Sequence, residues 1–175
     1  MPTAPRLDVR FPIVALCSAV ALAMAGCGKQ EEPKPAEAPK AAAPAEQKVV
    51  VKIGHAAPLT GSIAHLGKDN ENGVKLAIDQ ANAKGITIGG KKIAFEMISE
   101  DDEGKPDKGP IIAQKFADAK VAGVAGHLNS GVTIPASAVY NQAGIPMISG
   151  SATNPKLTEQ GFKTIFRVVG RDDRT

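Results

Sequence analysis

The sequence has very few aromatic side chains: Phe, Tyr and Trp make up 3% of its 175 residues, and there is no tryptophan. Proteins that hold single-stranded nucleic acid stack its bases on aromatic rings. The net charge of +3 is small, and the basic residues form no stripe along the chain. Both observations argue against a nucleic-acid partner.

Cysteine is almost absent as well. Cys17 and Cys27 both stand near the N-terminus, so the rest of the chain has neither a disulfide nor a thiol nucleophile. Residues 27–47 are mostly Lys, Glu, Pro and Ala, a composition that cannot bury enough apolar surface to order itself. We expect a tether there, semi-extended at its prolines, and one folded domain over residues 48–175.

The first 26 residues have the layout of a secretory signal peptide. Two arginines precede an apolar run over residues 11–25, which is too short to cross a bilayer comfortably. Residues 24–27, Met-Ala-Gly-Cys, resemble the lipobox of bacterial lipoproteins, in which the cysteine is lipidated. We therefore predict lipidation at Cys27 and a location in the periplasm or on the outer face of the cell envelope. Cleavage near Ala25 without a lipid is the alternative.

No pattern in the sequence indicates a metal or a cofactor. His55, His65 and His127 have spacings that match no common metal site. The acidic residues 100–103 lack the Asp-x-Asp-x-Asp-Gly pattern of a calcium loop and are interpreted as a solvated turn at a strand end.

Short apolar runs alternate with helical patterns along the folded part. Val49–Ile53 is continuous and β-branched, as in a strand buried on both faces. Further strands are expected at 92–99, 121–125, 145–148 and 164–169, with a short hairpin before 92, and helices at 70–84, 107–119, 134–143 and one turn at 156–160. This order predicts an α/β fold with a mostly parallel sheet and helices on both faces.

The helix over residues 134–143 has a predicted start. Thr133 is the expected N-cap, and Pro135 would then stand in the first turn, where its missing N–H costs nothing.

Two predicted strands end in turns rich in small hydroxyl residues. Ser130 and Thr133 follow the strand that stops at Gly126, and Ser151 and Thr153 follow the next one. Ligands of open α/β sheets bind outside the carboxyl ends of the strands, and helix N-termini favour an anionic group. We interpret these turns as a recognition surface for a small polar molecule.

Two other interpretations of these residues are open. The serines and threonines could be turn and cap residues only. Ser130 could also be a nucleophile with His127 as its base, which would indicate a small α/β hydrolase. No third orienting group or Gly-x-Ser-x-Gly elbow accompanies that pair, and we expect no enzyme activity.

Residues 48–170 resemble the first lobe of branched-chain amino acid binding proteins, the solute receptors of ABC transporters. Four stretches carry most of the resemblance: residues 53–61 (IGHAAPLTG), 72–82 (NGVKLAIDQAN), 126–131 (GHLNSG) and 145–155 (IPMISGSATNP). Phe166 and Arg167 follow at the usual distance. The stretches stand in the family's order and cover nearly the whole folded part.

The resemblance implies a periplasmic-binding-protein fold of type I, in which two lobes close on a ligand. In that family the first lobe holds the α-carboxylate and α-amine of an amino acid. Carried over to this sequence, the hydroxyl of Ser130 would bond the carboxylate. The backbone of Ser151 and the hydroxyl of Thr153 would meet the carboxylate and the ammonium. Permease subunits would be the protein partners.

This sequence departs from the family in three places. Leu66 stands where some leucine binders have an aromatic residue, so the side-chain pocket is expected to differ. Gly104 and Asn129 replace a cysteine pair found in some members. The family's chain crosses to a second lobe shortly after Arg167, so we expect the 175 residues to be a fragment with uncovered apolar faces. An amide- or amino-acid-sensing receptor of the same fold is the alternative function.

Overall fold

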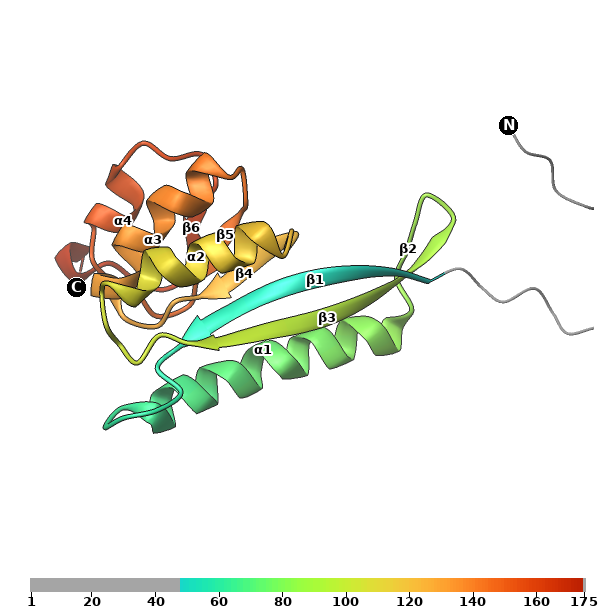
Figure 1. Cartoon of the computed structure of the whole chain (residues 1–175), viewed down its shortest axis with the longest axis horizontal. Helices are drawn as coiled ribbons and strands as arrows, with labels where there is room; N and C mark the ends of the chain where they lie inside the picture. The colour runs from blue at the N-terminus through green and yellow to red at the C-terminus, as the bar shows by residue number, and fades with distance from the viewer. Residues whose placement is uncertain (1–47, 175) are drawn as a thin grey trace, which may run out of the picture. The chain divides into compact units, whose positions relative to one another are not determined.

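A computed structural model describes residues 48–174 (Figure 1). The predicted signal peptide, Cys27 and the tether lie outside the described residues. Within residues 48–174, none of the helices combines the length and the apolar character that a membrane crossing requires.

The described part is built on a six-stranded sheet in the order β2-β3-β1-β4-β5-β6. The strands are β1 (Lys48–Ala57), β2 (Thr87–Ile88), β3 (Lys91–Asp101), β4 (Gly123–Gly126), β5 (Met147–Ser149) and β6 (Ile165–Arg167). All neighbours are parallel except β2 and β3, which form the expected hairpin. The prediction of a mostly parallel α/β sheet is confirmed.

Helices cover both faces of this sheet. The helices are α1 (Ala64–Lys84), α2 (Lys108–Asp118), α3 (Ser130–Gln142) and α4 (Lys156–Glu159), and a 3-10 turn, η1, spans Asp172–Arg174. The long α1 lies along β1 and β3 on one face, and α2, α3 and α4 lie together on the other (Figure 1). Gly85, with a φ of 66°, ends α1 in the left-handed conformation that glycine adopts without strain.

The core lies between the sheet and the layer of α2, α3 and α4. Its largest apolar side chains are Phe116, Tyr140, Met147 and Leu157, each at most 1% exposed. Gly54 makes room for Phe116, because a Cβ there would stand 2.9 Å from the ring. Full burial of such a side chain contributes about 1.5–3 kcal/mol.

The first strand differs from its prediction. It runs four residues further, to Ala57, and its beginning is exposed, with Val49 at 37% and Val50 at 49%. The β-branched run, which Lys52 interrupts, was interpreted as buried on both faces. Burial depends on which helices cover the strand, and a local sequence pattern does not contain that information. Exposed apolar side chains also remain at Ile148 and Phe166, as the uncovered faces were expected to show.

The start of α3 was predicted wrongly. The helix begins at Ser130 with Asn129 as N-cap, so Thr133 is not the cap and Pro135 lies inside the helix. Val132 and Thr133 are fully buried, and packing of this turn against α2 extends the helix beyond what the proline suggests. The closest approach is at Gly109 of α2, where a Cβ would stand 2.6 Å from the carbonyl oxygen of Val132.

Candidate functional site

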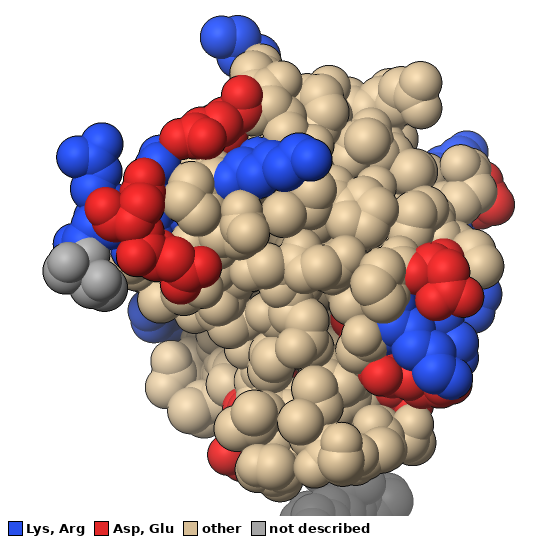
Figure 2. Space-filling model, turned by 90° about the vertical axis from the view of Figure 1, so that its left-hand side faces the viewer, with Lys and Arg blue, Asp and Glu red and all other residues tan. Residues whose placement is uncertain are grey.

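The carboxyl ends of β1, β4 and β5 meet on one side of the described part. Ala56 is paired with Gly126, and Ala125 is paired with Ile148, so the loops that follow these strands start close together. The arrowheads of β1 and β3 point to the left in Figure 1, and Figure 2 looks onto that side. Charged side chains gather around its rim, while the centre is largely uncharged. A ligand there would meet neutral dipoles.

Ser130 is the first residue of α3 and lies in the loop after β4. The first two backbone bonds of the helix run from the N–H groups of Val132 and Thr133 to the carbonyl of Asn129, at 3.0 and 2.9 Å. The N–H groups of Ser130 and Gly131 precede them and have no carbonyl of the helix to bond. The Ser130 hydroxyl accepts a bond from the Asn154 N–H at 3.3 Å, so its own proton is free to donate.

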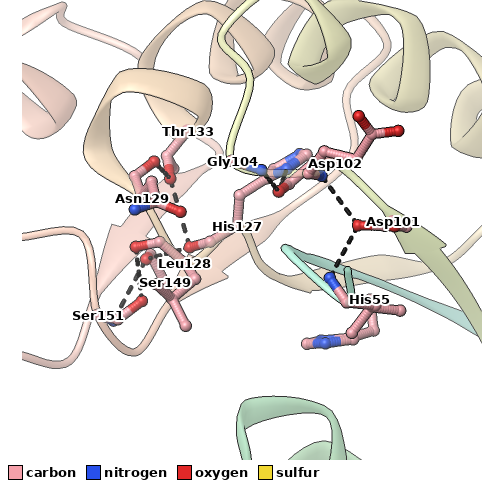
Figure 3. Close-up of polar contacts among 12 residues, drawn as sticks. His55, Asp101, Asp102, Gly104, His127, Leu128, Asn129, Thr133, Ser149 and Ser151 are labelled. Carbon is pink, nitrogen blue, oxygen red and sulfur yellow. Dashed lines mark hydrogen bonds and ion pairs between the residues drawn. The ribbon is translucent and has the colours of Figure 1, made fainter. Parts of the chain in front are cut away.

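Ser151 and Thr153 lie in the loop between β5 and α4. The Ser151 hydroxyl donates to the Leu128 carbonyl at 2.8 Å, and this bond joins the loop to the one that carries Ser130 (Figure 3). Among residues 48–174 the Thr153 hydroxyl has no hydrogen-bond partner, which leaves it available. The two predicted serine and threonine turns are therefore adjacent, and their direct contact with a ligand stays a prediction.

Leu66 lies in the first turn of α1, just after the loop that follows β1, and its side chain is 45% exposed. That exposure leaves it open to contact. Its membership of the same site stays a prediction.

Ser149 was not among the predicted site residues, yet it connects the two loops. Its hydroxyl donates to the His127 carbonyl at 3.0 Å and accepts from the Ala152 N–H at 3.0 Å (Figure 3). A strand-end serine is a common turn residue, so the sequence contained no distinctive signal for this role.

His127 is fully buried between Asp102 and Tyr140, which are buried as well. Its Nδ1 lies 2.7 Å from Oδ2 of Asp102 (Figure 3). Its Nε2 lies 3.0 Å from the Tyr140 hydroxyl. Burial, and then the charge of Asp102, raises the pKa of Tyr140, so its hydroxyl stays protonated and donates to Nε2. Both ring nitrogens are engaged, which leaves none to take a proton from Ser130. The geometry gives no support to a Ser130–His127 nucleophile pair.

Asp101 and Asp102 do not form the solvated turn that the acidic run suggested. Asp102 is 0% exposed, and its Oδ1 also accepts the Gly104 N–H at 2.9 Å. Asp101 accepts the Leu59 N–H at 2.8 Å and the Thr60 hydroxyl at 2.5 Å. Burial raises the pKa of Asp101, but the hydrogen bonds, above all that from Thr60, outweigh burial and hold this pKa below its ordinary value.

His55 lies in β1 and is also 0% exposed. Its Nδ1–H donates to the Ala125 carbonyl at 2.8 Å, which makes Nε2 an acceptor, and Nε2 has no partner among the described residues. Burial lowers the pKa of His55, so the ring is neutral at pH 7. No three His, Cys, Asp or Glu side chains within residues 48–174 are grouped so as to hold a metal ion.

Gly104 and Asn129, the two positions that replace a cysteine pair, are neighbours in space. A Cβ at Gly104 would stand 3.5 Å from Oδ1 of Asn129.

Comparison with known proteins gives a consistent result. A family model described as periplasmic binding protein matches residues 50–175. A Leu/Ile/Val-binding protein homolog of Brucella abortus is 47% identical over 124 residues, which are 71% of this chain and 33% of that protein. This chain thus spans about a third of the length of the curated relatives it matches.

Solved structures agree. The substrate-binding protein LivJ of Streptococcus pneumoniae, in complex with isoleucine, has a TM-score of 0.65 at 33% identity over 71% of this chain and 35% of its own. A solute-binding protein of Rhodopseudomonas palustris BisB5, in complex with 3,4-dihydroxybenzoic acid, has a TM-score of 0.60 at 32% identity over 70% of this chain and 32% of its own. The family match, the sequence identity and the shared fold show that the chain belongs to the periplasmic binding protein family.

Proposed function

We propose that this protein is the solute-binding component of an ABC importer and that its described lobe binds the carboxylate end of a branched-chain or related aliphatic amino acid. The observation that carries the proposal is the start of α3, where free N–H groups and the Ser130 hydroxyl adjoin the loop of Ser151 and Thr153. The similar proteins with isoleucine and with 3,4-dihydroxybenzoic acid have ligands that differ in every part except the carboxyl group.

The proposed contacts divide the ligand's two charges between neutral groups. The carboxylate accepts from the Ser130 hydroxyl and from the N–H groups at the start of α3, whose dipole favours negative charge. The backbone of Ser151 and the hydroxyl of Thr153 meet the carboxylate and the ammonium. A hydrogen bond to a charged group contributes about 1.5–3 kcal/mol. A largely uncharged centre lets such dipoles bind a zwitterion without attracting other ions.

The aliphatic side chain of the ligand would contact Leu66. This residue is apolar and 45% exposed, so burying it against a ligand removes apolar surface from water. The curated relatives named Leu/Ile/Val-binding protein homologs favour a branched-chain or related aliphatic amino acid.

In the whole protein, a second lobe would close on the ligand by a hinge motion and present a docking surface to permease subunits. The proposed location is the periplasm or the outer face of the cell envelope, with the lipid on Cys27 as anchor.

We infer that the protein catalyses no reaction. Labelling cells with a fatty-acid analogue tests the anchor: Cys27→Ala should lose the label, and Cys17→Ala should keep it.

A nuclear magnetic resonance titration tests the ligand site. Leucine added to the full chain should shift the amide signals of the loops at Ser130 and Thr153. Leucinamide, which lacks the carboxylate, should not. Ser130→Ala should weaken leucine binding by roughly 10- to 100-fold, the equivalent of one charge-assisted bond. Thr87→Ala, a hydroxyl deletion in the distant β2, is the matched control. Equal affinity of leucine and leucinamide would contradict the proposal.

A further inference from the structure

Two consecutive carboxylates at the end of β3 bond two different loops of the candidate site. Asp101 is paired with Ala57 in the sheet. Asp102 follows directly after the last residue of β3, and the two carboxylates bond different partners: Asp101 the loop after β1, and Asp102 the His127 ring. Figure 3 shows them among the polar contacts that join β3 to these loops.

Asp101 fixes the loop of residues 58–63. One of its oxygens accepts the Leu59 N–H at 2.8 Å and the Glu103 N–H at 2.9 Å, and the other accepts the Thr60 hydroxyl at 2.5 Å. This loop leads directly into the first turn of α1, which carries Leu66. Asp101 therefore sets the place of the side chain that the aliphatic part of a ligand would meet.

Asp102 fixes the other loop through His127. The buried Tyr140 hydroxyl must donate its proton, and Nε2 of His127 is the acceptor at 3.0 Å. The proton of the ring is then on Nδ1, which donates to Asp102 at 2.7 Å. With the ring held at both ends, the His127 carbonyl is placed to accept from the Ser149 hydroxyl at 3.0 Å, and the Thr133 hydroxyl, which donates to the Asn129 carbonyl at 2.8 Å, lies 3.3 Å from it. These bonds set the start of α3.

We propose that Asp101 and Asp102 are positioning residues with separate tasks: Asp101 positions the surface that selects the ligand's side chain, and Asp102, through His127, positions the groups that bind its carboxylate. This inference rests on the proposed function. Asp101 would affect which amino acid is preferred, and Asp102 would affect how tightly any amino acid is bound, although neither residue would touch the ligand.

The division of tasks predicts two different binding patterns. Asp101→Ala should weaken leucine binding about tenfold and change alanine binding less than about threefold, because alanine has almost no side chain for the loop to select. Asp102→Asn should weaken both ligands by a similar factor of about ten. The new amide has only one acceptor oxygen, so its N–H must face either Nδ1 of His127 or the Gly104 N–H, and one of the two bonds that Asp102 accepts is lost. Asp107→Ala, an exposed acidic residue nearby, is the matched control.

Conservative replacement separates positioning from mere stability. Asp101→Asn keeps the oxygen that accepts the N–H groups, and the Thr60 hydroxyl can reverse to accept from the new amide. It should therefore restore the leucine-to-alanine affinity ratio of the unchanged protein. We expect Asp101→Asn to bind leucine and alanine as the unchanged protein does, and Asp102→Asn to bind both more weakly. A general loss of stability would not produce this difference between the two positions.

Hydrogen exchange of the ligand-free full chain provides the decisive measurement, since it does not depend on the proposed ligand. Asp101→Ala should speed exchange of the N–H groups of residues 59–63, and of Glu103, which it also bonds, but not of residues 127–133. Asp102→Asn should speed exchange of residues 127–133, and of Gly104, but not of residues 59–63. The inference is overturned if either variant loosens both loops, or if both variants lower leucine and alanine affinity in the same proportion. If the unchanged protein binds neither amino acid, the proposed function fails, and the exchange pattern alone decides the positioning roles.

Discussion

Replacing Gly67 by alanine tests how closely α1 is seated on the end of β1. A Cβ at position 67 would stand 2.0 Å from the carbonyl oxygen of Pro58 and 2.7 Å from its carbon. Ordinary contact begins near 3.4 Å, so the helix and the loop would have to separate by 3.4 − 2.0 = 1.4 Å. Both contacts are to backbone, which cannot swing aside as a flexible side chain does. Such overpacking costs about 1–3 kcal/mol.

Gly73→Ala is the matched control in the same helix. A Cβ there meets nothing within 4 Å, so the higher helix propensity of alanine should stabilise the fold by about 0.5–1 kcal/mol. Alanine gains the same helix propensity at position 67, so the two variants should differ by the overpacking cost, roughly 1–3 kcal/mol in the free energy of unfolding, with Gly67→Ala the less stable.

Urea unfolding followed by circular dichroism at 222 nm measures this difference, and the method suits a chain with one tyrosine and no tryptophan. Thermal melting gives a second estimate, at about 4 °C per kcal/mol for a domain of this size. If Gly67→Ala is as stable as Gly73→Ala, the close contact with Pro58 does not constrain α1, and the reasoning about the loop before Leu66 is wrong.

Three further changes test the described contacts. Burial lowers the pKa of His55, so as the pH falls the unfolded chain takes up a proton before the folded chain does. The free energy of unfolding should therefore decrease below about pH 6.5, by up to about 1.4 kcal/mol per pH unit. Denaturation curves between pH 5 and 7 should lose this slope in His55→Gln and keep it in His65→Gln, which alters an exposed residue. Tyr140→Phe leaves Nε2 of the buried His127 without a donor and should cost about 1–3 kcal/mol in urea unfolding, whereas an unchanged midpoint would contradict the assigned bond. Asn82→Ala removes two bonds, at 2.9 and 2.8 Å, that join α1 to the backbone of β3, and faster hydrogen exchange in β3 should follow.

The order of strands and helices could be predicted from local patterns. Apolar runs, helical spacing and the glycine after Lys84 indicated the elements in the order that the structure has. The boundaries that failed are the ones that packing decides. The early start of α3 depends on burial of Val132 and Thr133 against α2, and a local pattern does not contain the position of a second helix.

The candidate site shows the same division. The two turns of small hydroxyl residues could be recognised from the sequence, and the bond between Ser151 and Leu128 shows that their loops lie together. That Ser130, Ser151 and Thr153 bind a ligand stays a prediction. Asp102 and His127 could not be paired in advance. They are 25 residues apart, and an acidic run beside a strand is far more often solvated than buried.

The sequence by itself determined the alternation of strands and helices, the polar turns at two strand ends and the family, because these depend on residues near one another in the chain. Only the tertiary structure decided which polar groups lose contact with water. Burial of Asp102, His127 and Tyr140 is set by helices and strands that are distant in sequence, and once buried these groups must bond one another. That requirement joins the end of β3 to the start of α3.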